Sequence, residues 1–228
     1  MIFATKPSRR ETIGGGIYLI LYIAVLPWLI PMITHAFAPG LDAAQSNFVY
    51  FCVNFAATTV IFRKYLLRSL KDALRIPSRT LWYALLGYMG NQVLSTMAAM
   101  AILNLYPDFI NVNDSSINTL VLQNRQLMAI GAVFLAPVAE ELLFRGLIFR
   151  GLYDRSPVAA HLVSILLFSA IHVSGYFGLY EPRLLLLCFI QYLPAAYCLN
   201  FAYRYSGTIA APILMHMLTN LAALSAMR

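Results

Sequence analysis

Seven apolar stretches along the chain constrain its fold more than any other feature. They cover residues 16–37, 47–62, 80–103, 120–147, 157–173, 183–203 and 207–226. A helix that spans a bilayer needs about 20 predominantly apolar residues. The composition agrees, since 61% of the 228 residues are hydrophobic and 11% are charged, whereas typical soluble domains are about 25% charged. The sequence therefore predicts an all-α, polytopic transmembrane helix bundle of about seven helices, with six to eight as the range.

No polar or Pro/Gly-rich linker divides the chain, which predicts one integral membrane domain. Within it, residues 1–119 hold the N-terminal transmembrane helices and a basic segment, and residues 120–228 hold most of the intramembrane polar residues. The fourth apolar stretch contains Pro137. Because proline removes a backbone donor and clashes with the preceding turn, this stretch is expected to be a kinked helix or two helices that meet at a break.

The distribution of Lys and Arg predicts how the chain is oriented. Cytoplasmic connections of membrane proteins are enriched in these residues, and a cytoplasmic N-terminus places nearly all of them on that side of a plasma or inner membrane. The net charge of +7 is therefore mainly a topology signal and does not indicate a nucleic-acid partner. Residues 63–79 carry cations at helical spacing opposite leucines, typical of an amphipathic helix on the cytoplasmic bilayer surface. A solvated connector that obeys the same charge rule is the simpler interpretation.

The segment EELLFR places Glu140, Glu141 and Arg145 inside the fourth apolar stretch. Ionisable residues inside membrane helices are rare and usually face a cavity or a partner. On an α-helix Glu141 and Arg145 are about 40° apart around the axis, and Glu140 is about 100° from Glu141. Arg145 is therefore expected to neutralise Glu141, whereas Glu140 points elsewhere and remains free to accept a proton. A charge network that only secures a helix end is the structural alternative.

Two further polar pairs occur at helical spacing. FSAIH contains Phe168 and His172, and HMLTN contains His216 and Asn220. Each pair lies four residues apart and so presents one face of its helix. A lone intramembrane histidine is often only a hydrogen-bonded packing residue. Together with Glu140, however, these side chains on three helices form a set that can converge on one cavity.

EELLFR, FSAIH and HMLTN, in this order on three separate apolar stretches, resemble the three motifs of the CPBP family of intramembrane proteases. This family, also called Abi, includes CAAX prenyl endopeptidases and bacteriocin-processing or immunity proteins. The resemblance covers roughly residues 120–226. It implies hydrolysis of a peptide bond in a membrane cavity that opens toward the cytoplasm, with a membrane-associated protein or peptide as substrate and the lipid bilayer as surroundings. A prenylated C-terminus, a bacteriocin leader and a signalling peptide all fit.

The resemblance also implies roles for individual residues. Glu140, assisted by His172, is expected to deprotonate the attacking water, and a raised proton affinity in an apolar cavity suits that task. His216 and Asn220 are expected to donate hydrogen bonds to the oxyanion. Glu141, Arg145 and Phe168 are expected to support them. No cofactor is required in this mechanism.

Other mechanisms use the same residues. Glu140, His172 and His216 are a chemically sound zinc set, but Asn220 suits oxyanion binding better than zinc binding, which favours the metal-free version. A serine mechanism through Ser174 would leave the paired glutamates without a task. A non-catalytic membrane scaffold or immunity factor that binds a peptide remains the main non-enzymatic alternative, and the lack of an internal repeat argues against a transporter. The sequence indicates no oligomeric state.

Overall fold

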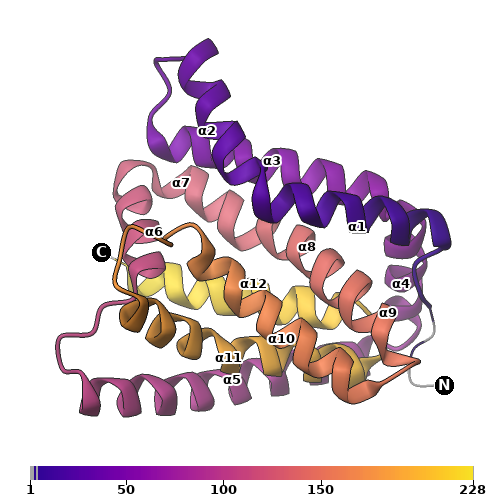
Figure 1. The fold of residues 1–228 in the computed structure, drawn as a ribbon. Coiled ribbons are helices and arrows are strands. Elements are labelled where there is room, and N and C mark those ends of the chain that lie inside the picture. Colours follow the sequence, from indigo (N-terminus) through magenta and orange to yellow (C-terminus); the bar gives the residue numbers. More distant parts are fainter. Residues whose placement is uncertain (1–2, 4, 228) are drawn as a thin grey trace.

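The computed structural model describes residues 3 and 5–227, which form a helix bundle (Figure 1). The N-terminal half contains α1 (Arg9–Ala24), α2 (Leu26–Phe37), α3 (Ala43–Ile61), α4 (Arg63–Arg75), α5 (Pro77–Leu105) and α6 (Val112–Gln123). The C-terminal half contains α7 (Arg125–Met128), η1 (Ala129–Leu135), α8 (Ala136–Glu141), η2 (Leu142–Phe149), α9 (Arg150–Tyr153), α10 (Pro157–Ser174), α11 (Pro182–Ser206) and α12 (Ala210–Ala226). Among these residues the only β pairing is an isolated bridge. The all-α prediction is confirmed.

Three helices are long and apolar enough to cross a membrane by length and composition. They are the continuous helix Arg125–Tyr153, which comprises α7 to α9, and the helices α10 and α11. A fourth span is possible if α1 and α2 cross together as a bent pair, and α12 is apolar but shorter. These helices identify an integral membrane protein. The number of about seven spans stays a prediction.

The first apolar stretch is broken rather than straight. Helices α1 and α2 meet at an angle of 65° around Val25. Pro27 lies in the first turn of α2, where its missing N–H is harmless, but its ring prevents α1 from continuing in a straight line. The bend moves α2 away from the axis of α1, as Figure 1 shows.

The helix Arg125–Tyr153 continues through Pro137, so the expected break does not occur. The turns before and after α8 are π-helical. Ahead of the proline, the N–H of Ala136 bonds to the carbonyl of Gly131, five residues back. In that register the next donor would be residue 137, which has no N–H. The carbonyl of Ala132 instead accepts a hydrogen bond from Asn220 Nδ2 at 2.7 Å, so a side chain of α12 replaces the missing donor.

This long helix runs through the centre of the bundle, between α1 and α3 on one side and α10 to α12 on the other (Figure 1). Its second half is the core of the molecule. Phe144 and Phe149 are fully buried and pack with Phe168 of α10, Tyr65 of α4 and Tyr203 of α11. The aromatic core therefore fills the bundle on the C-terminal side of the EELLFR segment.

Most cations lie at one end of the bundle, which we call the basic end. Lys6 pairs with Asp154 at 3.7 Å, and Arg68 of α4 lies 3.8 Å from Glu11. Arg150 bonds to the carbonyl of Thr5. The N-terminal segment, α4 and α9 thus meet there, as they do near the N label of Figure 1. The opposite end holds the start of α6 and the ends of α10 and α12.

The tight contact between the long helix and α3 yields a stability prediction. A Cβ on Gly131 would overlap the ring of Phe51, whereas a Cβ on Gly151 of the same helix meets nothing within 4 Å. We expect Gly131→Ala to lower the free energy of unfolding by about 1–3 kcal/mol through overpacking, and Gly151→Ala to leave it unchanged or raise it by up to about 1 kcal/mol. Denaturant titration of both variants in detergent micelles measures this. Equal effects would contradict the close packing of η1 on α3.

Candidate active site

A buried ion pair lies at the centre of the site. Arg145 Nη1 donates to Glu141 Oε1 at 2.9 Å, and both side chains are 0% exposed. The remaining guanidinium nitrogens donate to α11, where Nε bonds to Asn200 Oδ1 at 3.2 Å and Nη2 bonds to the carbonyl of Ala196 at 3.1 Å. The ring of Phe168 lies 4.3 Å from the guanidinium carbon, in cation–π geometry. Every charged group of the pair therefore has a partner, which a buried charge requires.

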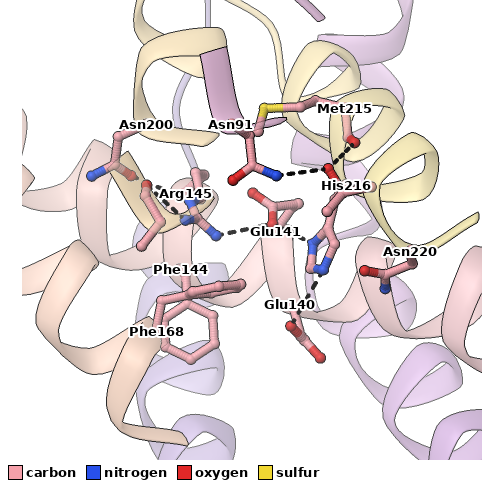
Figure 2. Close-up of polar contacts among 12 residues, drawn as sticks. Asn91, Glu140, Glu141, Phe144, Arg145, Phe168, Asn200, Met215, His216 and Asn220 are labelled. Carbon is pink, nitrogen blue, oxygen red and sulfur yellow. Dashed lines mark hydrogen bonds and ion pairs between the residues drawn. The ribbon is translucent and has the colours of Figure 1, made fainter. Parts of the chain in front are cut away.

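The same carboxylate orients His216. Nδ1 of His216 donates to Glu141 Oε1 at 2.8 Å, so Oε1 accepts from both His216 and Arg145. Because this hydrogen bond occupies Nδ1, Nε2 is the ring nitrogen left for other contacts. It lies 4.0 Å from Glu140 Oε2. Figure 2 shows His216 between the two glutamates.

Glu140 differs from Glu141 in its surroundings. Its Oε1 accepts a hydrogen bond from Tyr22 of α1 at 3.3 Å. Its Oε2 is buried and has no hydrogen-bond partner among the described residues. The ring of Tyr22 stacks with Tyr50 of α3 at 6.2 Å between centroids. The Oε2 of Glu141 is likewise buried without a hydrogen-bond partner in the described part of the chain. The two carboxylates differ because Glu141 is held in an ion pair and fully buried, whereas Glu140 is only partly buried.

His172 lies at the end of α10. Its Nδ1 donates to the carbonyl of Phe168 at 2.8 Å, which leaves Nε2 as an acceptor in the neutral ring. The ring stacks on Tyr192 of α11 with centroids 4.3 Å apart. The Tyr192 hydroxyl in turn donates to Asp114 of α6 at 2.7 Å. The histidine is therefore fixed on two sides.

One cavity of about 290 Å³ brings these side chains together. Glu140, His172, His216 and Asn220 all line it, so the structure assembles the four residues predicted to act on the substrate. Glu141, Arg145 and Phe168 do not line it and lie behind its wall. Tyr22 and Tyr50 form part of the wall, so residues from both 1–119 and 120–228 enclose the site.

The cavity does not extend toward the basic end. Glu140 lies near the middle of the helix Arg125–Tyr153, not in the half nearer the basic end. The lining continues from Glu140 to Asn113, Asp114 and Ser174, at the start of α6 and the end of α10. An active site toward the cytoplasm stays a prediction.

Residues 123–222 match a protein-family profile described as Type II CAAX prenyl endopeptidase Rce1-like. In this segment, which is less than half of the chain, the protein is similar to the CAAX prenyl endopeptidases of the CPBP family. No curated protein and no solved structure matches the chain significantly. The matched segment contains all seven site residues predicted from the motifs, whereas Tyr22 and Tyr50 lie outside it.

A zinc ion was the alternative to a metal-free site. Among the described residues no group of three or more His, Cys, Asp and Glu side chains is arranged to hold a metal ion. Nδ1 of His172 and Nδ1 of His216 are both engaged with protein acceptors, which leaves one ring nitrogen on each. One nitrogen is all that a histidine needs to bind zinc, so the zinc mechanism stays an alternative.

Several residues of the site were not predicted from the sequence. Asn200 lies within an apolar stretch, and an intramembrane amide is a signal that could have identified it. Asp114 and Tyr192 belong to the wall, but Asp114 lies in a segment that reads as an external loop. Tyr22 and Tyr50 stand among many aromatic residues of apolar helices, and no pattern distinguishes them.

The buried ion pair predicts a large loss of stability on breaking it. Arg145→Met leaves Glu141 buried without a counter-charge, which we expect to lower the free energy of unfolding by about 3–5 kcal/mol. Arg75→Met is the matched control, because Arg75 is 81% exposed and 3.7 Å from Asp72. We expect Arg75→Met to lower the free energy of unfolding by less than about 1 kcal/mol. Unfolding in detergent measures both, and similar values for the two variants would refute the role of the pair.

The contact between Asn220 and the proline turn predicts coupling between two helices. Asn220→Leu leaves the Ala132 carbonyl without its donor, and we expect a loss of about 1–3 kcal/mol. In a Pro137→Ala background the new backbone N–H can bond to Ala132, so the same substitution should cost less. A double-mutant cycle on unfolding free energies measures the difference. Strict additivity would show that Asn220 does not replace the missing donor.

Proposed function

We propose that this protein is an intramembrane protease of the CPBP family, which hydrolyses a peptide bond of a membrane-associated protein or peptide with a water molecule activated by Glu140. One observation carries the proposal. Glu140 lines the cavity and its Oε2 has no hydrogen-bond partner among the described residues, while the neighbouring Glu141 is paired with Arg145 and does not line the cavity. A general base must have a free acceptor within reach of the proton that it removes. Of the two glutamates, only Glu140 lies where a water in the cavity can reach it.

In the proposed reaction, Glu140 takes a proton from the water as the water oxygen attacks the scissile carbonyl carbon. The carbon–nitrogen bond then breaks, and the proton passes from Glu140 to the leaving amine nitrogen. His172 helps to orient the water, because its Nε2 accepts a hydrogen bond from the second O–H of the water. Nε2 is the acceptor that remains when Nδ1 donates to the carbonyl of Phe168. This step requires the water to lie between Glu140 and His172 in the cavity that both residues line.

We assign the stabilisation of the oxyanion to hydrogen bonds from His216 and Asn220. Nε2 of His216 lies 4.0 Å from Glu140 Oε2, so the oxyanion donor and the general base can both act on one scissile carbonyl group. An imidazolium at His216 is stabilised by Glu141, in the way that a buried carboxylate orients and stabilises a catalytic histidine. Asn220 Nδ2 uses one hydrogen on Ala132, and its second N–H is available to the cavity that it lines.

The closing test of the function compares peptide termini. We expect Glu140→Gln to abolish the termini that wild-type protein generates in membranes, because loss of a general base costs about a hundred- to ten-thousand-fold in rate. Asp72→Asn removes a carboxylate of α4 outside the site and should cleave normally. Mass spectrometry of termini at matched protein levels measures this. Identical termini for wild type and Glu140→Gln, with peptide still bound, would instead favour a non-catalytic binding scaffold.

The same assay addresses the zinc mechanism and the substrate. Cleavage by purified protein should persist after exhaustive treatment with EDTA, and loss that zinc restores would support Glu140, His172 and His216 as ligands. The sequences of the new termini identify the substrate. CAAX-type processing, maturation of a bacteriocin or peptide, and immunity are the classes that the family suggests.

A further inference from the structure

We propose that the substrate reaches Glu140 from the membrane face opposite the basic end, so that the protease cleaves extracytoplasmic segments. The inference rests on the proposed function of the Glu140 site, because it concerns the substrate of that site. It is carried by three features of the structure: the location of the cations, the packing between Glu140 and the basic end, and the direction of the cavity.

The cations identify the basic end as cytoplasmic. Contacts join the N-terminal segment, α4 and α9 at this end. The start of α5 and the end of α11 also meet there, where Arg79 donates two hydrogen bonds to the Tyr205 carbonyl. Among the described residues, the opposite end carries two cations, Arg125 and Arg183. Arg125 donates to the carbonyl of Met227, and Arg183 lines a hollow together with Asp108 and Glu181. Lys and Arg are retained on the cytoplasmic side of membrane proteins. The elements of the basic end carry Lys6, Arg9, Arg10, Arg63, Lys64, Arg68, Lys71, Arg75, Arg79, Arg150, Arg155 and Arg204.

The packing between Glu140 and the basic end leaves no path for a peptide. The Glu141–Arg145 pair comes first, and both side chains are fully buried. Beyond it lie Phe149, Tyr65 and Tyr203, each at most 1% exposed, and the two tyrosine hydroxyls share a hydrogen bond of 2.9 Å. A separate hollow at the basic end, lined by residues of the N-terminal segment, α1, η2 and α9, contains none of the site residues. Close-packed interiors of this kind exclude even single methyl groups.

The cavity extends in the other direction. From Glu140 it passes His216 and Asn220 along α12 and reaches Met227, just beyond the end of that helix. Ser174, the last residue of α10, and Asp114, in the first turn of α6, also line it. Asp114 is exposed. The mouth is therefore formed by helix ends at the face opposite the basic end.

The charges of the residues that line the cavity further restrict the class of substrate. Within residues 3 and 5–227, the lining of the cavity includes Glu140 and Asp114 but no Lys or Arg. A free C-terminal carboxylate near the scissile bond would find no cation among these residues, and buried unpaired anions are costly. The substrate that fits is an internal, extracytoplasmic segment of a membrane-associated protein or peptide, not the C-terminal tail of a cytoplasmic protein.

Cysteine labelling in intact bacterial spheroplasts tests the direction of entry. The native cysteines, Cys52, Cys188 and Cys198, are replaced first. Ser115→Cys reports the exposed start of α6, and Lys64→Cys is the matched control on exposed α4. A membrane-impermeant maleimide should label Ser115→Cys in intact spheroplasts and Lys64→Cys only after permeabilisation. The reverse pattern would overturn the proposal, while Glu140-dependent cleavage would stand unaffected.

A second variant connects the mouth to the reaction. Ser174→Cys places the thiol in the cavity wall. Labelling it from outside with a bulky impermeant maleimide should cause loss of the wild-type-specific termini relative to the same variant without label. Full cleavage after complete labelling would mean that the substrate enters elsewhere and would also overturn the proposal. If Glu140→Gln still cleaved, the proposed function itself would fail, whatever the labelling shows.

Discussion

The buried ion pair between Glu141 and Arg145 is the interaction on which the rest of the site depends. It stabilises two charges in the apolar core by giving each of them several partners. Through these partners it joins the long central helix to α11 at Asn200, to α10 at Phe168 and to α12 at His216. Three motifs that are distant in sequence are thus held in one arrangement, and His216 is held by Glu141 in the wall of the cavity.

A second constraint comes from Pro137. Since the long helix continues through the proline in a π-helical register, one carbonyl lacks its backbone donor, and Asn220 supplies the replacement. The proline therefore fixes α12 against the helix that carries Glu140. This contact gives Asn220 a structural task next to its proposed catalytic one. It also explains why residue 137 does not break the helix, as proline in an isolated helix would.

Much of this arrangement could be predicted from the sequence. Helical spacing was sufficient to pair Glu141 with Arg145 and to separate Glu140 from them, because both relations are local to one helix. Tyr22 could not be predicted, since its contact with Glu140 depends on how α1 packs across the bundle. Nor could the sequence show toward which end of the bundle the cavity extends. It depends on which end of the bundle is filled by aromatic side chains such as Phe149, and no single helix determines that.

Oxygen-isotope labelling tests the central claim, direct attack by a water that Glu140 activates, more directly than any other measurement. Purified protein in excess over a cleaved peptide undergoes a single turnover in ¹⁸O-water, and mass spectrometry then locates the isotope. The account predicts ¹⁸O in the new carboxyl terminus of the peptide and none in the protein fragment that contains Glu140. Isotope in the Glu140 carboxyl group, with an unlabelled first-turnover product, would show covalent attack by the glutamate and contradict the account.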